Sequence, residues 1–340
     1  MCKIRFSSPA GRWKEALPLG NGKTAVMVYG GVKCEQLDFN DATLWSGYPR
    51  NHDNAAAKDV LPEVRKLIKE GEFRRADEKV RTGMDGDYSQ AYMPLGSVFI
   101  KIFGGGKEGY TRTLDTDNGV FAVRSGGVTR TAFVSHPDKV AVYSIKADEK
   151  TDIKLTAKTP HKGGSGVMQG AFVLYGRAPD VALPNYLRTA LFPVRYNEGK
   201  AMAFAMAVSA ESDGKVTVSS RGISVKNASF VHFYFLTQTG FKDYKSMPEN
   251  DAATVAGECI NNLKCKKLTY PAVYERHISD FSSIMRRQKV HVADVDEDAE
   301  KIYIRARSGN ANAAAVQLLY DLGKYMIVSG SRTSQPLNLQ

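Results

Sequence analysis

The sequence predicts a mainly β domain that is followed by helices. Between about 95 and 240, short runs of β-branched and aromatic residues, such as 97–103 and 229–236, alternate with turn signals such as Asp117-Asn118-Gly119. Short strands at this spacing indicate a β-sandwich or barrel, and the length of the run indicates a large sandwich. After about 250 the apolar residues recur at helical spacing, which predicts a helical part.

The first 50 residues extend the β domain at its N-terminal side. Val26, Val28 and Tyr29 are good strand formers, and turns are expected at Gly20-Asn21-Gly22 and Gly30-Gly31. Two helices then interrupt the strands. The first opens at residues 54–57, and a second, short one covers about 72–82. They are typical of an insertion in a β domain.

Three helices are expected after residue 250, over 251–264, 274–287 and about 312–329. The last has an apolar face made of Ala315, Leu318, Leu319, Leu322 and Met326. Such a face needs a partner to bury it. Little sequence follows, so we expect the chain to be the front portion of a longer protein.

Composition excludes several classes of protein. The 340 residues carry a net charge of +11, but lysines and arginines are spread along the chain, and acids alternate with them in the one cluster, Arg65 to Arg81. Mixed signs at helical spacing are typical of a solvated surface, so we expect no nucleic-acid partner. No apolar run is long enough for a membrane span. The start lacks a signal peptide, which predicts a cytoplasmic protein unless a leader has been lost.

Neither the cysteines nor the histidines predict a metal site or a disulfide framework. The four cysteines are Cys2, Cys34, Cys259 and Cys265. The Cys259–Cys265 pair lacks a second pair or a nearby histidine, and the six histidines show no ligand spacing, so reduced thiols and no cofactor are expected. Gly22-Lys23-Thr24 looks like the end of a phosphate-binding loop, but Leu17 stands where that loop needs glycine.

Five stretches in order carry a stronger signal. They are Trp13–Gly22 (WKEALPLGNG), Phe39–Gly47 (FNDATLWSG), Tyr92–Gly96 (YMPLG), Tyr110–Asp115 (YTRTLD) and Gly323–Gln340. They resemble the motifs W-x-E-A-L-P-L-G-N-G, L-N-E-D-T-L-W-S-G, Y-Q-P-L-G, Y-x-R-x-L-D and a final segment ending N-L-Q of glycoside hydrolase family 95, the α-L-fucosidase family. Weaker echoes lie at Gly176-Arg177-Ala178-Pro179 and His277–Phe281. The resemblance covers the whole chain but only the first part of the family's length.

The resemblance implies a fold class and three parts. An N-terminal super-β-sandwich is expected over 1–250, a helical linker over 251–295, and the truncated start of a catalytic (α/α)6 barrel over 296–340. It also implies hydrolysis of terminal α-L-fucosides with inversion, without a cofactor. The expected partners are a fucosylated glycan or oligosaccharide and the remaining catalytic domain of the same protein.

Inversion needs one carboxylic acid to protonate the leaving oxygen and a base to activate water. In this family the glutamate, asparagines and aspartate that do so lie in the barrel, beyond this chain. We therefore expect no catalytic residue here and no activity from the chain alone. The acidic run Asp294–Glu300 is interpreted as the start of a helix, where negative charge is favoured.

Substrate-binding or domain-junction candidates remain. Asn338 and Gln340 match the N-L-Q segment near the sugar-binding end of the barrel, and amides suit sugar hydroxyls because each donates and accepts. Trp45, with Asn40 and Thr43, is expected at the domain junction, either stacking on a sugar ring or filling the interface core.

Two departures from the family pattern leave alternatives open. Asn40-Asp41-Ala42-Thr43 replaces N-E-D-T, and residues 331–334 replace S-R-P-G. These changes put the preference for fucose over L-galactose in doubt. A sandwich-plus-(α/α)6 sugar phosphorylase and a non-catalytic sandwich that binds a glycan or a protein partner are the remaining hypotheses.

Overall fold

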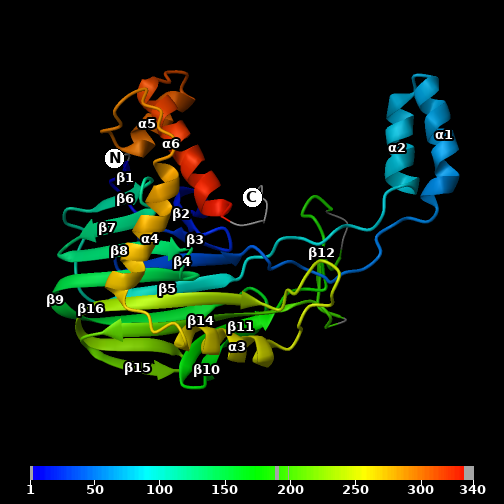
Figure 1. Cartoon of the computed structure of the whole chain (residues 1–340). Coiled ribbons are helices and arrows are strands. Elements are labelled where there is room, and N and C mark those ends of the chain that lie inside the picture. The colour runs from blue at the N-terminus through cyan, green and yellow to red at the C-terminus, as the bar shows by residue number, and fades with distance from the viewer. Residues whose placement is uncertain (1–2, 188–190, 198, 333–340) are drawn as a thin grey trace.

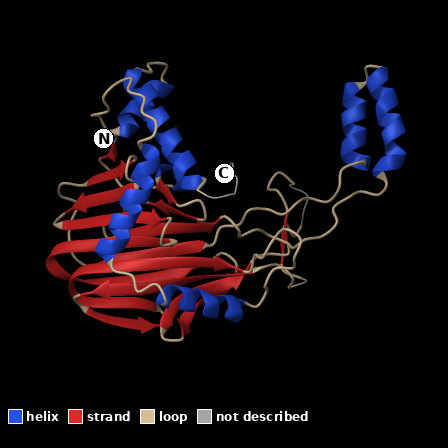
Figure 2. Cartoon of the chain, viewed as in Figure 1, coloured by secondary structure: helices blue, strands red, loops and turns tan. Residues whose placement is uncertain are grey.

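The computed structural model describes residues 3–187, 191–197 and 199–332. Within them, one 14-stranded antiparallel sheet bends into two facing layers, and helices pack on its outer side (Figures 1 and 2). The expected sandwich followed by helices is confirmed. No helix in these ranges is long and apolar enough to span a membrane.

The smaller layer is built from consecutive antiparallel strands. These are β2 (Leu17–Gly20), β3 (Thr24–Val28), β4 (Cys34–Asp41) and β5 (Gly96–Ile102). A 3-10 turn, η1 (Trp13–Glu15), leads into β2. In β4, buried residues alternate with partly exposed ones, as expected for a strand with one face in the core.

The larger layer follows the order β1-β6-β7-β8-β9-β16-β14-β11-β10, with β15 beside β16. Its strands are β1 (Lys3–Phe6), β6 (Thr111–Asp115), β7 (Val120–Ser125), β8 (Val128–Ser135), β9 (Val140–Lys158), β10 (Lys162–Met168), β11 (Ala171–Arg177), β14 (Ala203–Ser212), β15 (Lys215–Ser219) and β16 (Gly222–Thr239). A separate ribbon joins β12 (Val181–Ala182) to β13 (Val194–Arg195).

Two strands are much longer than the sequence predicts. β9 has 19 residues and β16 has 18. β9 pairs with β8 in its first half and with β5 in its second, so it passes from one layer to the other. The expectation of short strands only was wrong here, because the exposed polar residues Asp148, Glu149 and Lys150 resemble a turn although they continue the strand around the rim.

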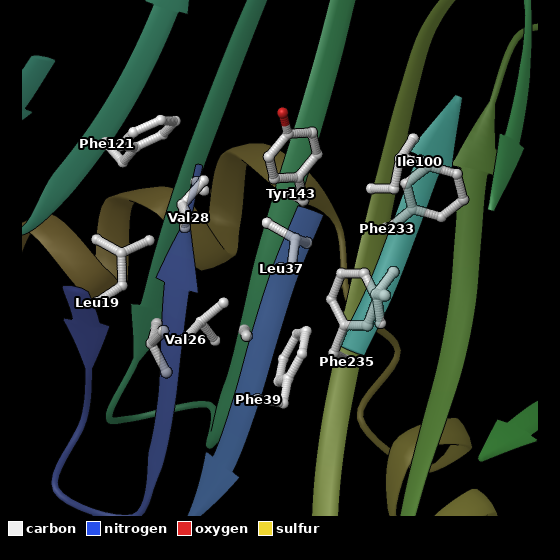
Figure 3. Packing of buried hydrophobic residues seen from close by; sticks show 14 of the residues in the cluster. Leu19, Val26, Val28, Leu37, Phe39, Ile100, Phe121, Tyr143, Phe233 and Phe235 are labelled. Atoms are coloured by element: carbon white, nitrogen blue, oxygen red, sulfur yellow. The ribbon is translucent and has the colours of Figure 1, made fainter. Parts of the chain in front are cut away.

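The core lies between the two layers. Figure 3 shows buried side chains of both layers in one cluster, with Leu37 beside Tyr143 of β9 and Phe39 beside Phe235 of β16. The Phe39 and Phe235 rings lie 5.1 Å apart. Burial of side chains of this size stabilises the fold by about 1.5–3 kcal/mol each.

A second apolar cluster covers the outer face of the larger layer. There α3 (Ala252–Lys264) and α4 (Tyr270–Met285) pack on β8, β11, β14 and β16. Asp251 caps α3 by accepting the N–H groups of Ala253 and Thr254. α4 begins at Tyr270, four residues before its expected start, because Pro271 suits the first turn of a helix.

The last two helices are α5 (Ala299–Arg307) and α6 (Ala313–Gly330). α5 begins at the acidic run that the sequence analysis interprets as the start of a helix, although it was not among the three helices whose bounds were predicted. α6 was expected, but the prediction of which residues form its buried face is only partly right. Leu318 and Leu322 pack against the core and Tyr325 is buried, whereas Leu319 is 73% exposed and Met326 is 46% exposed.

The predicted insertion is a helical hairpin, α1 (Ala57–Lys69) and α2 (Phe73–Gly83), which stands apart from the sandwich on two extended segments (Figure 1). Val64, Leu67 and Ala76 form its small core. Lys79 and Glu63 pair at 2.8 Å on its surface. The prediction of a solvated helix pair with mixed charges is confirmed.

Candidate functional site

The sandwich meets the helices at the turn between β2 and β3. The Tyr325 hydroxyl donates to the carbonyl oxygen of Pro18 at 2.8 Å, and the Gly22 N–H donates to the carbonyl oxygen of Ser329 at 2.8 Å. A Cβ on Gly20 would lie 2.7 Å from that same Ser329 oxygen. The glycines in the LPLGNG stretch therefore allow α6 to approach the sheet backbone.

An ion pair between Arg332 and Asp280 also joins helices at this junction. Arg332 follows α6 and donates from Nη2 to Oδ2 of Asp280 on α4 at 2.5 Å, while its guanidinium lies 5.8 Å from the Phe281 ring centroid. Burial, with the positive charge of Arg332, lowers the pKa of the neighbouring His136 below 6.5. The pair joins the first turn after α6 to α4.

A buried carboxylate organises the sandwich beside the junction. Asp41 is fully buried, and its Oδ1 accepts the N–H of Thr43 at 3.0 Å and the hydroxyl of Thr43 at 2.7 Å. Its Oδ2 accepts the Thr237 hydroxyl at 2.7 Å and lies 3.7 Å from Lys23 Nζ. The Thr239 hydroxyl donates to Thr43 at 2.6 Å. This network, which we call the Asp41 network, links β4 to the end of β16.

The candidates Trp45, Asn40 and Thr43 all lie on or directly after β4. The Trp45 indole N–H donates to the carbonyl oxygen of Ala42 at 2.9 Å, and its ring lies 5.3 Å from that of Tyr92. Trp45 also packs against the core. The indole N–H is therefore already hydrogen-bonded within the protein, so a ligand could contact only a face of the Trp45 ring. Asn40 is half-buried and lies opposite Ala25 of β3.

The Thr43 hydroxyl has a structural role. It donates to Asp41 and accepts from Thr239, so little hydrogen-bonding capacity remains for a sugar. Asn338 and Gln340 lie outside the described residues. Sequence reasoning missed Asp41, although an Asp two residues before a Thr at a strand end is a known signal for a side-chain-to-backbone turn.

The motifs that carried the resemblance contact one another. The bridge Trp45–Tyr92 joins the second stretch to the third. Arg112, from the fourth stretch, is 2% exposed and donates to the carbonyl oxygen of Glu15 in the first stretch at 2.8 Å. Tyr110 donates to the carbonyl oxygen of Gly30 at 2.8 Å. Much of the sequence signature is therefore structural.

The carboxylates near the junction are neutralised by cations rather than paired with each other. Asp41 faces Lys23, Asp280 binds Arg332, and Asp138 binds Arg276 at 2.6 Å. These ion pairs hold neighbouring elements together. The acidic run contributes Asp298, which caps α5 by accepting the Glu300 N–H and also accepts the Ser7 N–H at 2.6 Å, as its interpretation as a helix start predicts.

No group of three or more potential metal-ligating side chains occurs among the residues that the structure describes. Cys259 is buried on α3, where its Sγ lies 3.2 Å from the Leu236 carbonyl oxygen, and burial raises the pKa of this thiol to about 12. Cys265 is exposed at the end of the same helix. The two thiols therefore do not share a site.

Comparison with known families identifies both parts of the chain. Residues 4–244 match the family described as "Glycosyl hydrolase family 65, N-terminal domain", and residues 269–340 match "Glycosyl hydrolase family 95 catalytic domain". The sandwich belongs to the family 65 N-terminal domain family. α4 to α6 lie in the segment that matches the start of the family 95 catalytic domain.

The curated relatives of this chain are distant. Alpha-L-fucosidase 2 of Arabidopsis thaliana is 26% identical over 99% of this chain and 43% of its own length. Probable alpha-fucosidase A of Aspergillus niger is 24% identical over 96% of this chain and 42% of its own length. The Aspergillus oryzae protein of the same name is 25% identical over 98% of this chain and 48% of its own length. The chain thus spans less than half of each relative.

Proposed function

We propose that the chain is the N-terminal part of an α-L-fucosidase that removes terminal α-L-fucosyl groups from a glycan with inversion. The proposal rests on the match of residues 269–340 to the family 95 catalytic domain, a segment that contains α4, α5 and α6. The relatives named α-fucosidase, at 24–26% identity, support the substrate class. In this proposal 1–250 form the sandwich, 251–295 the linker and 296–340 the first part of the barrel.

The surface of α6 supports a catalytic domain that continues beyond these helices. One side of α6 packs on the sandwich through Leu322 and Tyr325. On its other side Leu319 is 73% exposed and Ile327 is 59% exposed. A helix that is apolar on both sides is typical of one buried between two layers. The layer that covers Leu319 in this proposal is the remainder of the (α/α)6 barrel.

The proposal assigns positioning, not proton transfer, to this chain. The catalytic acid and base belong to barrel segments beyond α6, and Asn338 and Gln340 contact the sugar. Trp45 contributes a ring face at the junction, and the Asp41 network with Thr43 and Asn40 fixes the backbone that carries it. No metal or cofactor takes part in this mechanism.

An activity assay on two proteins tests the proposal. The 340-residue chain and a version extended with the natural downstream reading frame are incubated with an aryl α-L-fucoside and an aryl α-L-galactoside. We expect no turnover by the shorter chain and fucoside hydrolysis by the extended one. Proton NMR of the first sugar released should show the β-anomer, because displacement by water inverts the configuration.

Three results would overturn the proposal. The first is turnover by the 340-residue chain, in a preparation whose host strain lacks fucosidase. The second is release of a sugar phosphate that depends on added inorganic phosphate, which favours a phosphorylase. The third is an extended protein that hydrolyses neither glycoside, which favours a non-catalytic sandwich.

A further inference from the structure

A pocket of about 290 Å³ opens where β10 and β11 meet the N-terminus of α3. Its wall includes Lys162, Tyr175, Arg177, Asp180, Tyr196 and Ala252. β10 forms one edge of the larger layer, and β1, which contacts α5, forms the opposite edge. The pocket is therefore separate from the junction between the β2–β3 turn and α6.

The strand at the rim of the pocket has few side chains. β10 reads KGGSGVM, and a Cβ added at Gly164 or Gly166 would meet nothing within 4 Å. A Cβ at Gly163 would lie 2.2 Å from the carbonyl oxygen of Tyr175. Glycine in a strand interior weakens the strand, and it commonly marks a place where a ligand approaches the backbone. Of these glycines, Gly163 lines the pocket, so the rim carries no side chain at that position.

One aromatic wall of the pocket is held in place. The His161 Nε2 donates to the carbonyl oxygen of Pro94 at 2.7 Å, so its Nδ1 accepts the Tyr196 hydroxyl at 3.1 Å. The His161 ring packs edge-on against Phe204 of β14 at 5.6 Å. The Lys162 ammonium lies 5.0 Å from the Tyr196 ring centroid. A ring fixed in this way loses little conformational entropy when a ligand binds.

The opposite wall is also fixed by hydrogen bonds. The carboxylate of Asp180 is buried and accepts three backbone N–H bonds from residues 199–201, each 3.0 Å long. Asn250 donates its side-chain amide to the Gly199 carbonyl oxygen at 2.9 Å. Arg177 donates Nε to the Asn250 carbonyl oxygen at 3.1 Å and is one of the residues that line the pocket. Part of the weak sequence echo at 176–179 therefore belongs to this wall.

The charges around the pocket are balanced. Lys162 and Arg177 line the pocket together with Asp180, and Asp251, which caps α3 beside the pocket, interacts electrostatically with Arg177. A phosphate or sulfate group finds no surplus positive charge there. Two tyrosines with polar groups beside them suit a ligand with an apolar ring face and hydroxyls at its edge. The volume of about 290 Å³ lies just below the range of about 300–1,000 Å³ for drug-sized ligands, which suits a ligand as small as one sugar ring.

We propose that this pocket binds one neutral monosaccharide unit of a glycan. The bound unit packs on the ring of Tyr196 and exchanges hydrogen bonds with Lys162, Arg177 and the bare backbone of β10. Such a site anchors a larger glycan on the sandwich. It requires no turnover, so the proposed fucosidase activity and this site can each fail without the other.

Saturation-transfer NMR with the 340-residue chain tests the pocket. The probes are L-fucose, D-glucose and, as a charged comparison, glucose 6-phosphate. We expect millimolar binding of at least one neutral sugar and no tighter binding of the phosphate. Tyr196→Ala should weaken that binding by at least about tenfold, equivalent to about 1.4 kcal/mol. Tyr303→Ala, which removes a 61% exposed tyrosine on α5, is the matched control and should bind as the parent does.

The second variant, Lys162→Ala, guards against misfolding, because Lys162 is exposed and its truncation leaves the core intact. It should retain the circular dichroism spectrum of the parent and still weaken sugar binding. The proposal is overturned if neither neutral sugar binds, if both folded pocket variants bind as the parent does, or if glucose 6-phosphate binds more tightly than glucose.

Discussion

Gly22 donates its backbone N–H to the carbonyl oxygen of Ser329 across 2.8 Å, which joins the first turn of the sandwich to the last turn of α6. The backbone of Gly22 has φ +82°, and a Cβ there would lie 2.6 Å from the backbone nitrogen of Arg332. The residue is therefore constrained twice, by its left-handed conformation and by the close approach of the segment after α6. This contact holds the end of α6 against the β2–β3 turn.

Gly22→Ala should weaken the junction for both of these reasons. The left-handed conformation alone costs a residue with a Cβ about 1–2 kcal/mol. Gly71→Ala is the matched control, because Gly71 has φ +78° but open space around its Cβ position. Urea unfolding should show a larger loss of stability for Gly22→Ala. Trypsin cleavage after Arg332, whose side chain is 5% exposed, should also become faster in that variant only. Equal stability losses and equal cleavage rates would refute the close approach.

Asp41→Asn should destabilise the sandwich by about 1–3 kcal/mol. An amide offers one acceptor oxygen where the carboxylate offers two, so either Thr43 or Thr237 loses its acceptor inside a buried network. The attraction of Lys23 is lost as well. The control is Asp38→Asn on the same strand, where the carboxylate also accepts side-chain donors but is only half-buried. Urea unfolding of both variants measures the difference, and an equal loss at the two positions would contradict the special role of Asp41.

The two sides of α6 should respond differently to the same substitution. Leu319→Lys places a charge on the exposed side, and we expect the stability of the 340-residue chain to change by less than about 0.5 kcal/mol. Leu322→Lys places the charge against the sandwich core and should lower the free energy of unfolding several times more than Leu319→Lys does. Thermal unfolding compares the two. In the extended enzyme the difference should shrink, because the proposed barrel covers Leu319. A Leu319→Lys variant that is as stable as the parent in the extended enzyme would count against that packing.

The sequence predicted those features that depend on local pattern. The hairpin α1–α2, the glycine turn before β3 and the helix at α6 follow from spacing and from residues that favour turns. Alternation also predicted strands at β5 and β16. It did not predict how far β9 and β16 extend, because exposed polar residues at the rim of a sandwich are indistinguishable from a turn in a single sequence.

At the candidate site, the features that the sequence did not predict depend on contacts between distant segments. Asp41 acquires its role from Thr237 and Thr239, which only the fold brings to the end of β4. Likewise Leu319 belongs to the predicted apolar face of α6, yet Tyr325 and Ser329 occupy the side that meets the sandwich. The direction in which a two-sided apolar helix packs is decided by its neighbours, and here one neighbour is the β2–β3 turn.

The stability of the chain should depend on pH through His277 of α4. Its ring is 1% exposed and lies 4.7 Å from that of Phe133, and its Nε2 donates to the Gly119 carbonyl oxygen at 3.2 Å. Burial lowers the pKa of His277 from 6.5 to about 4. Between these values the unfolded chain binds a proton that the folded chain does not. The stabilisation by neutral His277 is therefore complete above about pH 6.5 and is lost as the pH falls towards 4.

His277→Phe tests this dependence. Phenylalanine keeps the packing on Phe133 but cannot titrate, and at pH 7 it should cost only about 1 kcal/mol for the lost hydrogen bond to Gly119. Between pH 7 and 5 the parent should lose about 2 kcal/mol more stability than the variant, as expected from the proton linkage of one such group. His291→Phe, at an exposed position, is the control, and its stability should change between pH 7 and 5 as that of the parent does. Urea unfolding at the two pH values measures each difference. If His277→Phe and the parent lose equal stability between pH 7 and 5, His277 is not the group that destabilises the chain in acid.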